Sequence, residues 1–297
     1  MTERCEVLVV SGSPNGAADD PGNVPGNAPA DGPDPAVALA QELRAYRIDV
    51  RLAGAGTELV AVTEQSGVIT AELTDAVDRV QVAAEFLVTV GERAARDGRR
   101  LWIGDARDTE NLGWKLPAVL RGAGDLLLDT YLTEREQRPS DYRLSPLSQR
   151  FGGKRVRIAP GQRVPDDLVL WSPAEGRDVR LWPARRWTVL GFGSGSAITV
   201  RAVSERFGDQ VNAQVIGGGN SPSDLVTLLD RYGHVNRRLA KRGGSVLAIR
   251  PDRYVGLHTA PDPGIVLAYL EDLIPGGSPE TAPTEPGTAA APESFSP

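Results

Sequence analysis

The sequence is 297 residues long, with 40% hydrophobic and 24% charged residues, as expected of a globular protein of about two domains. A net charge of −6 argues against a nucleic-acid-binding surface, which needs clustered positive charge. The single cysteine, Cys5, excludes an internal disulfide, and with two histidines the chain is not expected to hold a metal. No stretch predicts a membrane span or a signal peptide, so we expect a cytoplasmic protein.

The first third of the chain predicts the start of a strand-helix-strand unit. Residues 6–10 (EVLVV) form a short apolar run typical of a buried parallel strand. Asp34 followed by Pro35 predicts the capped start of a helix, and a second strand is expected at residues 48–52. Between strand and helix, residues 15–33 are rich in Gly, Pro, Asn and Asp, which predicts a disordered insertion.

A different pattern follows. Alternating apolar and polar residues over 58–90 predict a small antiparallel meander. Residues 101–103 predict a buried strand that ends at Gly104 and Asp105. Apolar residues at helical spacing then predict two helices, over residues 112–120 and 125–138.

The rest of the chain predicts a second α/β unit. Strands are expected near Val156 and over 187–191, 211–216, 245–250 and 254–258. Helices are expected over 197–205, 223–231 and 264–274. Residues 276–297 are rich in Pro, Ala, Thr and Glu and predict a disordered tail.

Two groups of motifs carry a family resemblance. In the first, a strand ends in Gly104-Asp105-Ala106, and the helices after it contain NLGWKLPAVLRG, from Asn111, and LLDTYLTER, from Leu127. In the second, PGQRVP, from Pro160, is followed by Gly176-Arg177, by WTVL, from Trp187, and by IRPDRYV, from Ile249. The chain resembles the FAD-dependent aromatic hydroxylases of polyketide and phenol metabolism, which are class A flavoprotein monooxygenases.

The resemblance implies an α/β fold with two domains. The first would be a reduced Rossmann-like, FAD-binding-type domain over residues 1–145, with the insertion inside it. The second would be a thioredoxin-like C-terminal domain over residues 146–275, a module that is redox-inactive in the family. The tail would follow it.

Several residues that the family uses for its flavin are changed here. The family reads G-x-G-x-x-G after the first strand, because a side chain there would keep the pyrophosphate away from the backbone amides. This chain reads Ser11-Gly12-Ser13-Pro14-Asn15-Gly16, which replaces two of the three glycines. If a flavin were bound, the resemblance would place Gly12, Ser13, Gly104, Asp105 and Ala106 beside it.

Other parts of the family pattern are missing. No carboxylate follows the second strand to bind the ribose, the Pro-x-Gly-Gln-Gly-x-Asn loop that packs on the flavin ring is gone, and so is the large substrate-binding sheet. The sequence therefore predicts that no cofactor is bound, with FAD as the alternative. A flavin hydroperoxide would also need a closed, dry chamber that these residues do not build.

Individual residues leave alternatives open. Asp105 is either a residual ligand of the flavin ribityl chain or the cap of the helix that follows it. Residues 250–253 (RPDR) predict a β-turn. His234 and His258 have no partner in the sequence that would make them catalytic bases, and Ser194 is interpreted as a loop residue. The five tryptophans are expected to be core or interface anchors, of which one or two would line a ligand pocket.

Three functions remain open, and no catalytic residue is identified. The first is a redox-silent family member that binds a polyketide-like small molecule and assists a cyclisation by positioning it, as a non-redox cyclase. The second is an FAD-dependent monooxygenase with a reduced cofactor site. The third is a non-catalytic partner of a full-length oxygenase, or a decaying remnant with no chemistry left. The expected partners are thus a polyketide-like ligand, an oxygenase or a second copy, but neither nucleic acid nor membrane.

Overall fold

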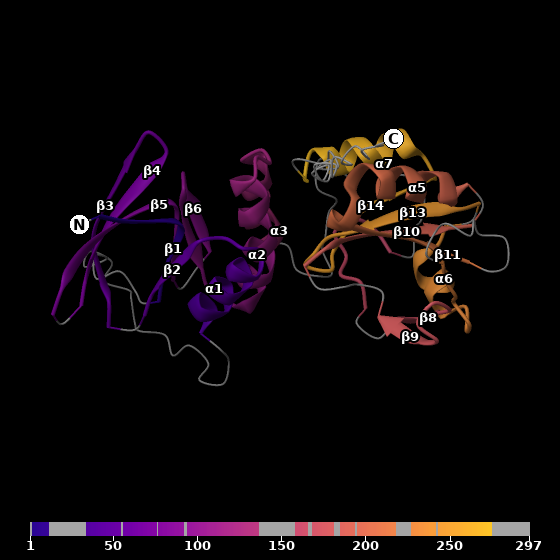
Figure 1. The fold of residues 1–297 in the computed structure, drawn as a ribbon, viewed down its shortest axis with the longest axis horizontal. Coiled ribbons are helices and arrows are strands. Elements are labelled where there is room, and N and C mark those ends of the chain that lie inside the picture. The colour runs from indigo at the N-terminus through magenta and orange to yellow at the C-terminus, as the bar shows by residue number, and fades with distance from the viewer. Residues whose placement is uncertain are drawn as a thin grey trace, which may run out of the picture.

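The computed structural model describes residues 2–11, 34–54, 56–75, 77–91, 94–136, 158–165, 168–180, 185–193, 195–217, 227–241 and 243–274. The whole predicted insertion lies outside these ranges, as do the tail, Ser194 and the strand near Val156. The described residues form an N-terminal part up to residue 136 and a C-terminal part from residue 158, which lie side by side in Figure 1. No helix among them is long and apolar enough to cross a bilayer.

The N-terminal part contains a forked sheet. Its strands are β1 (Thr2–Val10), β2 (Val50–Ala53), β3 (Glu58–Gln65), β4 (Val68–Thr74), β5 (Arg79–Val90), β6 (Ala95–Asp97) and β7 (Arg100–Ile103). β1 lies between β2 and β5 and is parallel to both, while β7 is parallel to the end of β5. The start of β5 pairs with β4 instead, and β3 pairs with β4, both antiparallel. This confirms the predicted meander.

Three helices cover one face of this sheet, between it and the C-terminal part (Figure 1). They are α1 (Pro35–Ala45), α2 (Ala106–Leu120) and α3 (Leu126–Glu136). As predicted, α1 begins with Pro35 and is capped by Asp34. α1 and α2 approach closely at Gly113, where a Cβ would lie 2.6 Å from Cγ of Glu42. Leucines of the helices and valines of β1 and β5 form the core between them.

The C-terminal part has a sheet with the strand order β12-β11-β10-β13-β14. The bounds are β10 (Trp187–Phe192), β11 (Val211–Ile216), β12 (Thr227–Leu228), β13 (Ser245–Ile249) and β14 (Val255–Thr259). The helices α5 (Ser196–Phe207) and α7 (Pro263–Glu271) cover one face. The helix α6 (His234–Leu239) and the hairpin β8 (Val169–Ser172) to β9 (Arg177–Arg180) lie at the other face (Figure 1).

One sequence prediction is wrong where the structure describes it. A helix was expected over residues 223–231, but Thr227 and Leu228 form strand β12, which pairs with the end of β11. The residues of that prediction before Thr227 lie outside the described ranges. The hairpin β8 to β9 and the helix α6 were not predicted, because neither has a clear period of apolar residues.

Candidate functional site

The carboxyl edge of the N-terminal sheet is where the family resemblance would place a flavin. Because β1, β2, β5 and β7 are parallel, their carboxyl ends meet at this edge. The hydroxyl of Thr109, in the first turn of α2, lies 3.4 Å from the carbonyl oxygen of Pro35, the first residue of α1. Two helix N-termini, which attract anions, therefore lie close together here.

The N-terminus of α1 is closed by a side chain of the same molecule. The carboxylate of Asp34 accepts hydrogen bonds from the Ala36 amide, at 2.8 Å, and from the Ser11 hydroxyl. Asp34 thus places a negative charge where the family places the flavin pyrophosphate. Gly12 and Ser13, which were predicted to contact a flavin, lie outside the described residues.

The N-terminus of α2 is closed in the same way. The carboxylate of Asp105 accepts from the amides of Arg107, at 2.8 Å, and Asp108, at 3.3 Å. The buried carboxylate of Asp108 reaches back to the amides of Gly104, at 2.7 Å, and Asp105, at 3.1 Å, which completes a capping box. Asp105 therefore caps the helix, one of its two predicted roles, while its side chain remains exposed.

These described residues do not fit a flavin held in the family's manner. β2 ends at Ala53, whose carbonyl oxygen accepts the Ser11 amide at 2.9 Å, and no ribose-binding carboxylate stands at that end. Residues 107–110, where the ring-facing loop would be, are the first turn of α2. A cofactor pyrophosphate would meet the carboxylate of Asp34 in place of free amides.

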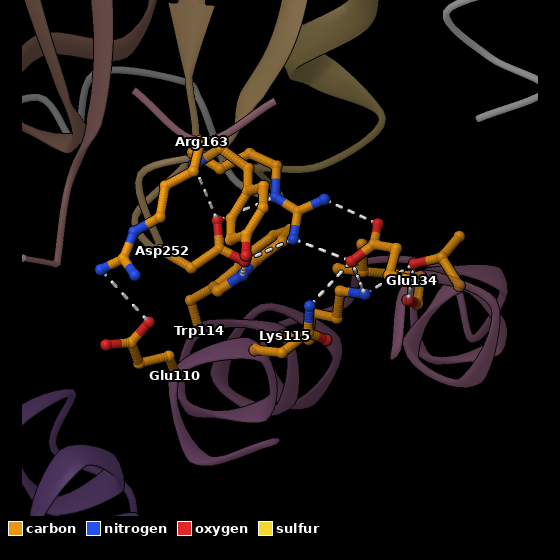
Figure 2. Close-up of polar contacts among 11 residues, drawn as sticks. Glu110, Trp114, Lys115, Glu134, Arg163 and Asp252 are labelled. Atoms are coloured by element: carbon orange, nitrogen blue, oxygen red, sulfur yellow. Dashed lines mark hydrogen bonds and ion pairs between the residues drawn. The ribbon is translucent and has the colours of Figure 1, made fainter. Parts of the chain in front are cut away.

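A second polar site joins the two parts of the molecule (Figure 2). We call Trp114, Lys115, Glu134, Arg250 and Asp252 the interface cluster. Arg250 binds Glu134 through two parallel hydrogen bonds of 2.6 and 2.8 Å, and it also binds Asp252. The indole nitrogen of Trp114 donates to Asp252 at 3.0 Å, and Nζ of Lys115 donates to Glu134 at 2.9 Å.

Burial sets the electrostatics of the interface cluster. Burial lowers the pKa of Lys115 to about 8, although the neighbouring Glu134 opposes that shift. Burial alone would raise the pKa of Glu134, but the charges of Arg250 and Lys115 outweigh it and hold that pKa well below its usual value. With two cations and two carboxylates the cluster balances its own charge, which a buried set of ions requires.

Sequence reasoning missed this cluster. Residues 250–253 do form the predicted turn, yet Arg250 and Asp252 are buried instead of facing solvent. A signal was available, because Trp114, Lys115 and Glu134 belong to one resembling motif and Arg250 and Asp252 to the other. The structure shows that the two motifs contact each other.

Two of the tryptophans line a cleft, and both histidines lie in the C-terminal part. Trp114 and Trp187 are buried and line a cleft of about 210 Å³ between the two parts, so they are both anchors and pocket residues. His258 is buried, and its Nδ1 lies 3.0 Å from the carbonyl oxygen of Ile158. His234 stacks on Tyr232 at the start of α6. Within the described ranges, no group of three or more His, Cys, Asp or Glu residues could hold a metal ion.

Comparison with curated proteins finds two related hydroxylases, while no model of a protein family matches the chain. The 3-(3-hydroxy-phenyl)propionate/3-hydroxycinnamic acid hydroxylase of Mycolicibacterium smegmatis is 45% identical over 80 residues, covering 20% of this chain and 14% of that protein. The hydroxylase of the same name from Mycobacterium avium is 27% identical over 291 residues, covering 69% of this chain and 50% of that protein. The chain thus spans at most about half the length of these relatives.

Solved structures with a similar fold are hydroxylases too. OxyS anhydrotetracycline hydroxylase from Streptomyces rimosus superposes with a TM-score of 0.59 at 13% identity, over 91% of this chain and 99% of that one. Aklavinone-11 hydroxylase, in a ternary complex with FAD and aklavinone, gives 0.51 at 17% identity, over 76% and 74%. Since such neighbours bind FAD, FAD is possible for this fold. The chain is similar in fold to FAD-dependent aromatic hydroxylases and similar in sequence to two curated hydroxylases, of whose length it spans at most about half.

Proposed function

We propose that the protein is a redox-silent relative of the hydroxylases that binds an aromatic, polyketide-like small molecule. One observation carries this proposal. The N-terminus of α1, where the resemblance would place a cofactor pyrophosphate, is capped by the chain's own carboxylate, Asp34, which also accepts from the Ser11 hydroxyl. Bringing a pyrophosphate there would set like charges against each other and displace hydrogen bonds that already exist.

Binding without redox chemistry still supports a reaction. Holding a flexible substrate in one conformation away from water accelerates a cyclisation through orientation, without an acid, a base or an oxidant. A non-redox cyclase is therefore the activity that we propose if the protein is an enzyme. The proposal divides the chain into a reduced Rossmann-like domain, residues 1–145, and a thioredoxin-like domain, residues 146–275. The two separate sheets support that division.

The absorbance spectrum of the purified protein tests the proposal. We expect no flavin band near 450 nm and no change in the melting temperature when FAD is added. Asp105→Asn serves as the diagnostic variant, because it keeps a cap of similar shape but removes the charge. Stoichiometric FAD with a normal flavin spectrum, weakened by Asp105→Asn, would overturn the proposal.

That result would favour the second function, an FAD-dependent monooxygenase with a reduced site. The observation in its favour is the position of Asp105. It follows the end of β7 with an exposed side chain, where the family motif has its ribityl ligand. Gly104 and Ala106 flank it as the motif requires.

A third function, as a non-catalytic partner of a full-length oxygenase or as half of a homodimer, is supported by the short connection between β5 and β6. In the family, a large substrate-binding sheet stands there, and a partner would have to provide it. Co-purification of an oxygenase with the tagged chain would support this function. A monomer that binds FAD by itself would exclude it.

A further inference from the structure

The cleft between the two parts carries a more specific inference. Trp114 and Trp187 line this cleft, and their rings meet edge to face with their centroids 5.6 Å apart. Tyr46 and the rim residue Arg186 also line it. We propose that this cleft binds a small aromatic monocarboxylate, with its ring against the tryptophans and its carboxylate on Arg186. The inference rests on the proposed ligand-binding function and names the place and class of the ligand.

The size of the cleft limits the ligand. A cavity of about 150 Å³ with aliphatic and aromatic walls is large enough to hold benzene. Pockets that enclose drug-sized ligands measure about 300 to 1,000 Å³. At about 210 Å³, the cleft therefore accommodates one aromatic ring with a short polar substituent, and a larger aromatic acid would project from it.

Two of the arginines at the cleft are already committed to the fold. Arg121 donates to the carbonyl oxygen of Tyr46, just beyond the end of α1, and Nε of Arg185 binds Glu42 at 2.9 Å. Both α1 and α2 end at the cleft, and helix C-termini carry partial negative charge. Arg121 and Arg185 offset that charge and hold the parts together, so neither is free for a ligand.

Arg186 is different. It is exposed, it lines the cleft, and within the described ranges it makes no hydrogen bond or ion pair. A free guanidinium binds a carboxylate through two parallel hydrogen bonds. Trp187 pairs with Val211 in the parallel register of β10 and β11, which puts Gln210 beside Arg186 as a second donor. Asp209, also at the cleft, would repel a second negative charge and so favours a monoanion.

The backbone before Arg186 is held in a costly conformation. Arg185 has a φ of 68°, in the left-handed region that side chains other than glycine avoid. The Tyr46 hydroxyl donates to the carbonyl oxygen of Arg185 at 3.0 Å, and the ion pair to Glu42 holds its side chain. Strain of this kind gathers at binding sites, where it fixes the direction of the next residue. Here it fixes Arg186 at the rim.

Calorimetric titration of the full-length protein with benzoate tests the inference. The neutral benzamide, of nearly the same shape, is the matched ligand. The matched variants are Arg186→Gln and Arg180→Gln, since Arg180 is an exposed arginine on β9 that does not line the cleft. We expect benzoate to bind about tenfold more weakly to Arg186→Gln, as for the loss of a charge-assisted hydrogen bond, with no change in Arg180→Gln.

Three results would overturn the inference: equal binding of benzoate and benzamide, no saturable binding of benzoate, or benzoate binding that Arg186→Gln leaves unchanged. The FAD titration is read separately. If FAD binds and benzoate binding still requires Arg186, the proposal that the protein is redox-silent is contradicted and the ligand site in the cleft is supported. If neither FAD nor benzoate binds, the ligand site in the cleft is contradicted and the redox-silent proposal is supported.

Discussion

The carboxyl edge of the N-terminal sheet and the interface cluster differ in how far they keep the residues of the motifs that this chain shares with the hydroxylases. At the edge, the residues that would hold a flavin are replaced or bonded to each other, as Asp34 is to Ser11. At the interface, the motif residues remain, and they join the two parts through Arg250 and Glu134. The retained motif residues therefore hold the two parts together, whether or not a cofactor is bound.

Exposure to solvent sets how much stability the protein loses when a polar contact is removed in each region. The caps at the edge are exposed or partly so, and water replaces a lost cap at a cost of about 1 kcal/mol. The interface cluster is buried, with side-chain exposures of 0% for Lys115 and 1% for Asp252. A buried ion that loses its partner cannot be hydrated. Removing one partner there therefore destabilises the protein several times more than removing a helix cap at the carboxyl edge.

The largest effect is expected from Arg250→Met, which keeps the volume but leaves Glu134 and Asp252 without their shared cation. We expect the free energy of unfolding to fall by about 3 to 5 kcal/mol, measured by urea denaturation. Arg163→Gln is the control, because its pair with Glu110 spans 3.8 Å and is exposed, and it should change stability by less than about 1 kcal/mol. Equal effects of the two variants would remove the contrast between buried and exposed ions.

A smaller effect is expected from pH. The pKa of Glu134 in the folded protein lies below its usual value of 4.5, so the unfolded chain binds a proton first as the pH falls. Stability from this group is complete above pH 4.5 and is lost below it, by on the order of 2 kcal/mol. Urea midpoints measured from pH 3 to 7 should fall more steeply for the wild type than for Glu134→Gln. Parallel curves would show that the pKa of Glu134 is the same in the folded and the unfolded protein.

The smallest effect is expected at the carboxyl edge. Asp105→Ala removes two hydrogen bonds at the start of α2, which should lower the free energy of unfolding by about 1 kcal/mol. Asp209→Ala, at an exposed position of the 3₁₀ helix Gly208–Gln210, should change it by less than about 0.5 kcal/mol. Thermal unfolding of both variants measures the difference. A loss with Asp105→Ala as large as with Arg250→Met would break the comparison between the two regions.

Much of the fold could be predicted from local signals. Asp34 and Pro35 mark the start of α1 because capping chemistry acts within a few residues. The meander was predicted because alternation has the period of a strand. Strand β1 was expected from residue 6, yet it begins at Thr2, since its polar first residues pair with β5. Such pairing depends on residues far along the chain, which no local pattern contains.

The same limit applies to the candidate sites. The sequence of residues 250–253 predicted the turn, which depends on Pro251 and Asp252 alone. It did not predict burial, because the partner of Arg250 is Glu134, 116 residues earlier. The sequence predicts a helix in place of strand β12 for a similar reason: the two residues of β12 become a strand only by pairing with β11. Gly104, Asp105 and Ala106 follow the end of β7, as the sequence predicts, while their role toward a flavin stays a prediction.

The end of β5 is a point where the sheet tolerates a change in chain length. β5 pairs with β4 along its first part and with β7 along its last, and β7 follows only after the chain has passed Val90. The chain leaves the sheet there and returns at Ala95 as β6, which lies outside β7. Residues inserted or deleted between Val90 and Ala95 would not interrupt any strand pairing of the sheet. A lid or a binding module from another protein could therefore be inserted at this position.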